Sequence, residues 1–168
     1  MERSKKVVFV AHCLLNQNAR AAGAERAAGA IKEVIQLLTE SDVGIIQLPC
    51  PELEFDTGLN RRPKPRSSFD NKKYRQACKK LSCELLSKIE EYMKNGYTIV
   101  GLLGIEFSPT CSVYQIENGS RIIPGKGIFI EELEAEMRKK RFQVPIIGVN
   151  LNNVYSSLEK IQALLKYS

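Results

Sequence analysis

Hydrophobic residues gather in four short continuous runs, and the longer segments between these runs carry apolar residues at helical spacing. Short runs rich in Val, Ile and Leu are typical of parallel strands that are buried on both faces. They predict strands at residues 5–13, 43–48, 97–105 and 144–149. The segments between and after them predict amphipathic helices at residues 21–38, 70–94, 128–140 and 153–166.

Two segments interrupt this alternation. Residues 52–68 contain Gly58, Pro63 and Pro65 and are expected to be irregular, and Asn118-Gly119 predicts a small hairpin within residues 112–123. The order of strands and helices predicts an α/β fold, in which helices cover a parallel sheet. We expect one single-domain, three-layer unit over residues 1–168, with a mainly parallel sheet of about four strands and a β-hairpin excursion.

Composition narrows the class of protein. With 43% hydrophobic and 26% charged residues, the 168-residue chain has the balance of a globular domain rather than of a disordered one. No apolar run approaches the ~18 residues of a membrane span, and the N-terminus lacks a signal-peptide pattern, so we expect a cytoplasmic protein. The formal net charge of +6 favours an anionic partner such as a nucleotide or RNA.

Three of the five cysteines occupy equivalent places in the predicted fold. Cys13, Cys50 and Cys111 each lie at or just past the end of a predicted strand. Ligands of open parallel sheets bind outside the carboxyl ends of the strands, so we expect these three cysteines to converge on a metal site. Cys78 lies on the apolar face of the helix at 70–94 and is expected in the core, whereas Cys83 lies off that face and is expected to be partly exposed.

Three thiolates leave a metal centre one protein ligand short. A zinc ion would take His12 as its fourth ligand, but strand alternation points His12 away from Cys13 and favours a structural or outer-shell role for it. A cubane iron–sulfur cluster usually takes four thiolates, so three would leave one iron open to a substrate.

Four motifs follow one another along most of the chain. They are Cys13-Leu14-Leu15 with Arg20 and Gly23, Cys50-Pro51-Glu52 with Gly58-Leu59 and Arg62-Pro63, Ser108-Pro109-Thr110-Cys111, and Gly125-Lys126-Gly127-Ile128-Phe129. In this order they resemble the thiouracil desulfidase (TudS-like) family. The resemblance implies a 4Fe-4S cluster held by Cys13, Cys50 and Cys111. It also implies a non-redox C–S bond hydrolysis, in which water replaces the sulfur of a thiolated pyrimidine base, nucleotide or tRNA nucleoside.

The resemblance also bears on the other site residues. Ser108 matches the family serine three residues before the third cysteine and is the candidate for proton transfer or orientation. Glu52 is the carboxylate nearest to Cys50 in sequence and is the candidate base, with the capping of backbone amides as its alternative role. The motif arginines Arg20 and Arg62 are the candidates for substrate binding. The expected partner is a small thiolated molecule, with tRNA as the larger alternative and no oligomeric state implied.

The chain departs from the family pattern at four positions. Gln47, Ala22, Phe107 and Ser112 stand where the family usually has a glutamate, an acidic residue, a lysine and a glycine. The loss of two carboxylates keeps open a second function, that of a sulfur or cluster carrier without turnover.

Other interpretations also stay open. One is a metal-free thiol enzyme with Cys13 as its nucleophile and His12 as its base. The cations of residues 61–66 predict either a phosphate- or RNA-binding loop or a solvated one. The glycines at 125 and 127 favour a turn over an anion site, because they lack the spacing of nucleotide-binding loops.

Overall fold

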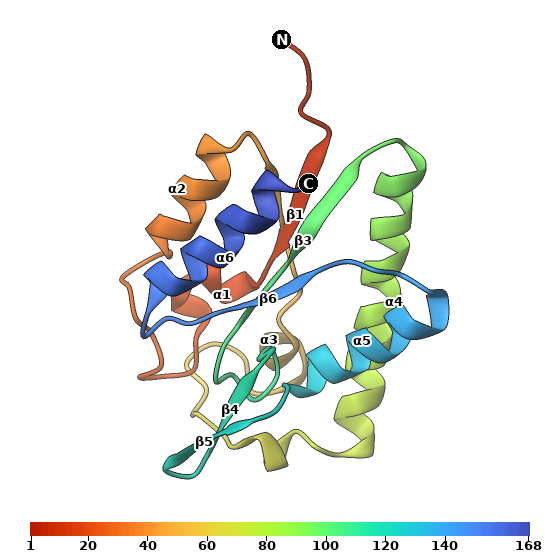
Figure 1. Cartoon of the computed structure of the whole chain (residues 1–168). Helices are drawn as coiled ribbons and strands as arrows, with labels where there is room; N and C mark the ends of the chain where they lie inside the picture. The colour runs from red at the N-terminus through yellow and green to blue at the C-terminus, as the bar shows by residue number, and fades with distance from the viewer.

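A parallel four-stranded sheet forms the centre of the computed structural model, which describes the whole chain from Met1 to Ser168 (Figure 1). The strand order is β2-β1-β3-β6, and all three neighbouring pairs are parallel. The strands are β1 (Lys6–Val10), β2 (Gly44–Gln47), β3 (Thr98–Ile105) and β6 (Ile146–Val149). The structure thus confirms the predicted α/β fold with a parallel sheet.

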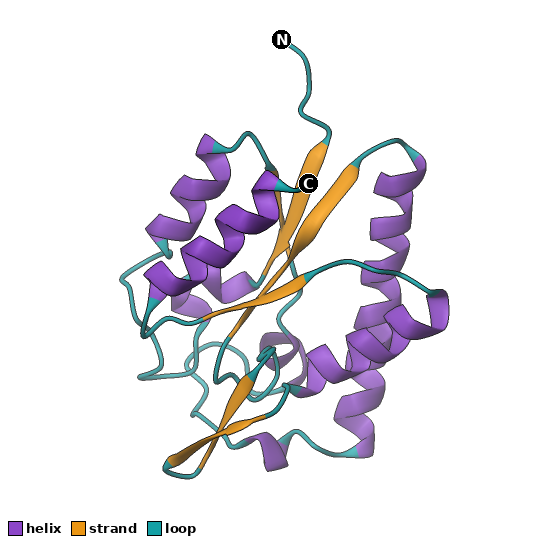
Figure 2. Ribbon diagram, in the orientation of Figure 1, coloured by secondary structure: helices purple, strands orange, loops and turns teal.

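Helices cover both faces of this sheet (Figure 2). One face carries α2 (Lys32–Glu40) and α6 (Val154–Lys166), and the other carries α4 (Lys72–Lys94) and α5 (Ile128–Lys140). In β1, Phe9 packs into the core under α4 and α5, whereas Val8 and Val10 pack into the core under α2 and α6. This follows from the alternation of side chains along a strand and gives the predicted three layers. No helix is both long enough and apolar enough to cross a membrane.

A small antiparallel hairpin stands apart from the main sheet. It consists of β4 (Gln115–Asn118) and β5 (Arg121–Pro124), joined by a turn in which Gly119 has a φ of +65°. Glycine adopts such a φ without steric cost, which is why Asn118-Gly119 predicted the turn. In the view of Figure 1 the hairpin lies beyond the carboxyl ends of β1 and β3.

The prediction of a helix at residues 21–38 is wrong for residues 21–31, because α2 begins at Lys32. The preceding 3-10 helix, Gln17–Ala19, holds this segment in turns instead. The N–H of Gln17 donates to the Gly29 carbonyl (2.5 Å), and Oε1 of Gln17 accepts from the N–H of Arg26 (2.8 Å). Gly23 adds a φ of +82°, which a helix does not contain. Tertiary contacts therefore override the helix propensity of the alanine-rich segment.

The strand expected at residues 5–13 is also shorter than predicted. β1 ends at Val10, and α1 (His12–Leu15) follows it directly. The inference that His12 and Cys13 point to opposite faces of a strand is therefore wrong, since both residues belong to a helical turn. The segment expected to be irregular at 52–68 contains the short α3 (Pro51–Phe55) and a 3-10 helix at Arg66–Ser68.

Candidate functional site

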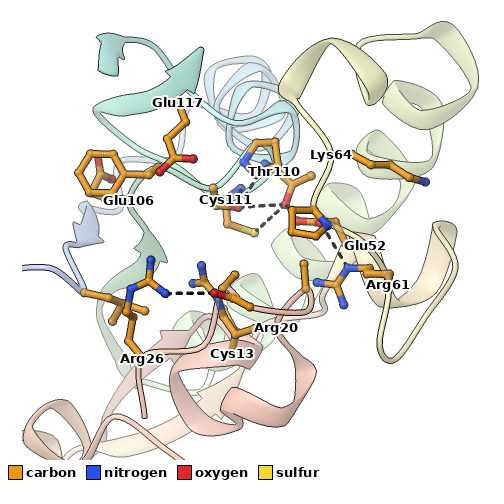
Figure 3. A pocket seen from close by; sticks show the side chains of 18 of the residues that line it. Cys13, Arg20, Arg26, Glu52, Arg61, Lys64, Glu106, Thr110, Cys111 and Glu117 are labelled. Carbon is orange, nitrogen blue, oxygen red and sulfur yellow. Dashed lines mark hydrogen bonds and ion pairs between the residues drawn. The ribbon is translucent and has the colours of Figure 1, made fainter. Parts of the chain in front are cut away.

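Cys13, Cys50 and Cys111 all line one cavity of about 320 Å³ beyond the carboxyl ends of the strands. Cys13 lies in α1 directly after β1, Cys50 immediately precedes α3 after β2, and Cys111 lies in the loop after β3. β2 lies on one side of β1, while β3 and β6 lie on the other. The order of the strands therefore reverses between β1 and β3, and the cavity lies at this reversal. Such a position is the usual ligand site of open α/β sheets. Figure 3 shows Cys13 and Cys111 facing the same space.

Burial changes the acidity of all three thiols. It raises the pKa of Cys13 to about 11, although the nearby Arg20 guanidinium opposes that rise. It raises the pKa of Cys111 well above the usual value, and the neighbouring Cys50 and Cys13 raise it further. Burial likewise raises the pKa of Cys50, against the opposing effect of the Leu53 N–H. All three buried thiols thus favour the neutral form, and a bound cation would favour their thiolate forms.

The loop that carries Cys111 is held by Ser108 and by two glycines. Oγ of Ser108 accepts hydrogen bonds from the N–H groups of Cys111 (3.0 Å) and Thr110 (3.3 Å). A Cβ at Gly127 would collide with the carbonyl of Thr110, and one at Gly104 would come within 2.5 Å of the carbonyl oxygen of Cys111. The N–H of Gly127 also donates to the carbonyl of Ser112 (3.0 Å). The segment at 125–127 is thus a supporting turn for the third cysteine.

Glu52 is buried in the cavity wall, where it connects the loops of all three cysteines. Its Oε1 pairs with Nε of Arg61 (3.3 Å), and its Oε2 accepts from the Thr110 hydroxyl (2.8 Å; Figure 3). Arg61 is itself buried and donates through Nη1 to the carbonyl of Ala19 in the loop after Cys13 (2.8 Å). Side chains, rather than the backbone amides considered for Glu52 as an alternative, are the partners of this carboxylate.

A chain of hydroxyl groups leads from Glu52 toward the cavity. Because Thr110 donates its hydrogen to Glu52, its oxygen is left to accept from Ser108, whose Oγ lies 3.3 Å away. Ser108 lines the cavity. Thr110 was not singled out from the sequence, although it stands between Ser108 and Cys111 in the third motif.

The cations of the site divide into those that line the cavity and those that do not. Arg20, Arg26, Arg61 and Lys64 line it, whereas Arg62 is exposed and lies outside its wall. The structure thus brings Arg20 to the cysteines but places Arg61, not its neighbour Arg62, in the cavity.

The basic loop at residues 61–66 is largely neutralised. Arg61 pairs with Glu52, Lys64 with Asp56, and Arg66 with Asp70 and Glu131. Arg62 is the one cation of this loop that forms no ion pair. Most of the loop's charge therefore stabilises the fold and does not face solvent as a phosphate-binding surface.

Another part of the cavity wall comes from the residues after β3, from the hairpin and from the residues after β6. Glu106 is buried and accepts hydrogen bonds from the N–H groups of Val113 (2.9 Å), Tyr114 (3.0 Å) and Gln115 (2.8 Å). These bonds fix the start of the hairpin against β3. Further lining residues on this side are Phe107, Pro109, Glu117, Leu151 and Asn152.

The three cysteines are the candidate donors for a metal centre. No three His, Cys, Asp or Glu side chains are grouped so that they would hold one ion, which leaves the alternative of zinc with His12 without geometric support. In a cluster each thiolate binds a different iron, so the donors need not converge on one point. The three cysteines also line a second space of about 20 Å³, whose other lining residues are Ala11, His12, Leu48, Pro49, Gly104, Phe129 and Ile130.

His12 lines the smaller space together with the three cysteines. Burial lowers the pKa of its imidazole, and the positive charge of Arg61 lowers it further. Cys78 is fully buried in the core, as expected, and Cys83 is half-buried beside Glu136 (Sγ to Oε2, 3.6 Å). Neither of these two cysteines lines the cavity.

Comparison with known proteins finds one solved structure with a similar fold and one protein with a similar sequence. No family model matches the sequence. A solved structure described as a [4Fe-4S]-dependent thiouracil desulfidase, TudS (DUF523Vcz), is similar with a TM-score of 0.61 and 19% identity, over 97% of this chain and 99% of that one. At this identity the likeness establishes the fold. The uncharacterized protein MJ0003 of Methanocaldococcus jannaschii is 37% identical over 164 residues, which cover 95% of this chain and 98% of that protein. The chain therefore belongs to the same protein family as MJ0003.

Proposed function

We propose that this protein is an iron–sulfur-dependent desulfidase, which removes sulfur from a thiolated pyrimidine base, nucleotide or tRNA nucleoside. The observation that carries the proposal is the meeting of Cys13, Cys50 and Cys111, from three different strand ends, at one cavity. The shared fold with a protein described as a 4Fe-4S-dependent thiouracil desulfidase supports it. Cys13, Cys50 and Cys111 would hold the cluster, and no fourth cysteine lines the cavity.

The net reaction needs no electrons. A thiocarbonyl and water give a carbonyl and hydrogen sulfide, so one oxygen replaces one sulfur. When bound, a cluster with one iron lacking a protein ligand supplies a soft Lewis acid that favours sulfur over oxygen. The protein then has to admit one flat substrate and one water molecule, to move protons, and to limit bulk solvent around the cysteines. The apolar residues of the smaller space beside the cysteines serve the last of these tasks.

Proton transfer is assigned to the hydroxyl chain in the cavity wall. Ser108 faces the cavity and is linked through Thr110 to the carboxylate of Glu52. In this arrangement Glu52 acts through the two hydroxyls, and Ser108 is the group that meets substrate or water. Gln47, which stands where the resembling family has a glutamate, is then not required as a base.

Substrate binding is assigned to the arginines. Arg20 lines the cavity and acts electrostatically on Cys13, so it is placed to attract an electron-rich or anionic substrate. Arg62 lies outside the cavity wall, so in this proposal it contacts only the larger substrates, such as the backbone of a tRNA.

The first test is the metal content of cysteine variants. Protein purified or reconstituted without oxygen should contain iron and acid-labile sulfide in equal amounts. Cys13→Ser, Cys50→Ser and Cys111→Ser should each lower both and stop sulfide release from 2-thiouracil. Cys83→Ser is the matched control, because Cys83 is half-buried and lies away from the cavity; it should leave both measurements unchanged.

Different outcomes separate the proposal from its rivals. Protein that stays free of iron after anaerobic reconstitution would overturn the cluster. Sulfide released in amounts no greater than the protein itself would indicate the carrier function, whereas many equivalents per chain would exclude it. Full activity in Cys50→Ser would instead support a metal-free thiol enzyme.

A further inference from the structure

Phe107 adopts a backbone conformation that bulky residues rarely take. Its φ is +67°, in the left-handed region. The other residues of this kind apart from glycines are Lys5, Asp42, Asn60 and Arg141. Asp and Asn tolerate this region, and Lys5 and Arg141 are exposed residues at the edges of secondary-structure elements. Phe107 alone among the five lines the cavity. Strain of this sort is retained where the surroundings enforce it and is concentrated at functional sites.

Hydrogen bonds on both sides hold Phe107 in this conformation. Its own N–H donates to the carbonyl of Gln115 in β4 (3.0 Å). The preceding N–H, of Glu106, donates to the carbonyl of Val149 at the end of β6 (2.9 Å). The Glu106 carboxylate in turn accepts three backbone N–H groups of residues 113–115. The main sheet and the hairpin therefore fix the backbone of Phe107 together, and the side chain is directed by the fold rather than by its own preference.

The cavity into which this side chain is directed has no other aromatic residue in its wall. About half of the other lining residues are charged or polar, including Arg20, Arg26, Glu117 and Asn152, and the rest are small or aliphatic. Phe107 is only half-buried and lines the cavity, so it is accessible to a molecule that occupies the cavity. As the one aromatic residue of the wall, Phe107 offers a flat apolar surface, which a planar heteroaromatic ring covers by offset stacking.

We propose that Phe107 is a specificity-determining residue that stacks on the planar ring of the substrate. The identity of that ring as a pyrimidine rests on the proposed function; the stacking itself rests on the strained backbone and on the composition of the wall. Phe107 lies one residue before Ser108 and four before Cys111. A ring stacked on it is therefore held beside both the hydroxyl that moves protons and the third thiol.

A binding experiment tests the stacking without any need for turnover. The chain contains no tryptophan, so Phe107→Trp introduces a single indole into the cavity wall. Titration with uracil, the product expected from thiouracil, should quench its fluorescence to a saturating level. The matched ligand is 5,6-dihydrouracil, which keeps the polar edge of uracil but loses the aromatic ring; it should quench much less. The matched variant is Tyr167→Trp, at an exposed position near the end of the chain, which should respond to neither ligand.

A kinetic experiment gives an independent measurement. Phe107→Leu keeps the apolar character but removes the ring, and should raise KM for 2-thiouracil about 5- to 140-fold, which corresponds to about 1–3 kcal/mol at 1.4 kcal/mol per tenfold. The change in KM should exceed the change in kcat. Phe107→Tyr restores a ring and should recover most of the lost affinity. A thermal unfolding curve of each variant shows whether it is folded.

The inference and the proposed function fail in different ways. Equal quenching by uracil and dihydrouracil, or an unchanged KM in Phe107→Leu, would overturn the stacking even if sulfide is released. Selective quenching by uracil in a protein that never binds iron or releases sulfide would leave the stacking in place and overturn the desulfidase.

Discussion

Thr110 is almost completely buried, and its hydroxyl is the sole hydrogen-bond donor to Oε2 of Glu52. Its oxygen is also within hydrogen-bond distance of Ser108. A buried carboxylate oxygen without a donor is costly, since it has lost its water and gained no partner. Thr110 therefore affects both the stability of the protein and the protonation path that the proposed reaction uses.

The variant Thr110→Val keeps the shape of the side chain and removes only the hydroxyl. We expect the free energy of unfolding to fall by about 1–3 kcal/mol, because Oε2 of Glu52 is left unsatisfied. We also expect slower sulfide release, because the path from Ser108 to Glu52 is broken. Denaturant unfolding and an activity assay measure the two effects.

Thr98→Val is the control for this change, since Thr98 is exposed and its hydroxyl makes no hydrogen bond within the protein. It should alter neither the stability nor the activity by a measurable amount. A Thr110→Val protein as stable and as active as the wild type would show that the hydroxyl has no role.

At the level of single residues, the sequence locates the cysteines better than their surroundings. The rule that ligands bind at the carboxyl ends of parallel strands brings Cys13, Cys50 and Cys111 together from their positions alone, and they line one cavity. It does not distinguish Arg61 from Arg62, because the direction of a side chain in an irregular loop depends on distant partners such as Ala19. Nor does it mark Thr110, whose importance arises from a contact with Glu52 across 58 positions of the chain.

The turn before α5 acts on the site through backbone contacts. Gly127 lies directly against the Thr110–Cys111 peptide, where no Cβ has room. Gly127→Ala should therefore displace the third cysteine and lower the free energy of unfolding by about 1–3 kcal/mol, as is usual for an overpacked site. It should also reduce the iron content that the proposed cluster would give. Iron analysis and denaturant unfolding measure these changes.

Gly29→Ala provides the comparison, because a Cβ at Gly29 would meet no atom within 4 Å. It should bind as much iron as the wild type and should be about as stable. Normal iron content in Gly127→Ala would mean that the loop of Cys111 moves without loss of the site.

The elements differ in how far the sequence predicts them. The helix at 128–140 was predicted with its observed bounds, because apolar residues recur at helical spacing up to a basic last turn. The hairpin was predicted from a local signal, Asn118-Gly119, that depends on no distant contact. In contrast, residues 21–31 have a helical composition but are held in turns by Gln17, and this contact is not visible in the sequence. The short α1 was missed because the apolar run of β1 continues into it.

In the molecule as a whole, α4 and α5 are joined by an ion-pair network centred on Arg75. Its guanidinium bonds Asp70 (2.7 Å), Glu131 (2.9 Å) and Glu132 (3.0 Å). Arg75→Ala should lower the free energy of unfolding by about 1 kcal/mol, the range of partly exposed pairs, and the loss should shrink in high salt. Lys80→Ala on the same helix is the control, because Lys80 is exposed and forms no ion pair; it should change little.

The same ion-pair network predicts how the stability of the protein changes with pH. The hydrogen bond from Arg75 lowers the pKa of Asp70 from its ordinary value of 3.8. A carboxylate whose pKa falls on folding stabilises the protein above its unfolded pKa, and this contribution is lost as the pH falls through the lower, folded pKa. The difference in stability between wild type and Arg75→Ala should therefore be full at neutral pH and should narrow in acid. A difference that stays constant down to pH values well below 3.8 would contradict this assignment.

Glu52, Arg61 and Thr110 link the loops of the three cysteines through contacts made only of protein groups. The hydrogen bonds and the ion pair that join the loops therefore do not depend on a cofactor bound to the thiols. In the proposed enzyme these contacts would matter when the cluster has to be re-formed after oxidation, because air destroys exposed iron–sulfur centres. If the proposed cluster is lost, these contacts would keep the three loops in register. Restoring the cluster would then need iron, sulfide and a reductant for the thiols, but no refolding of the chain.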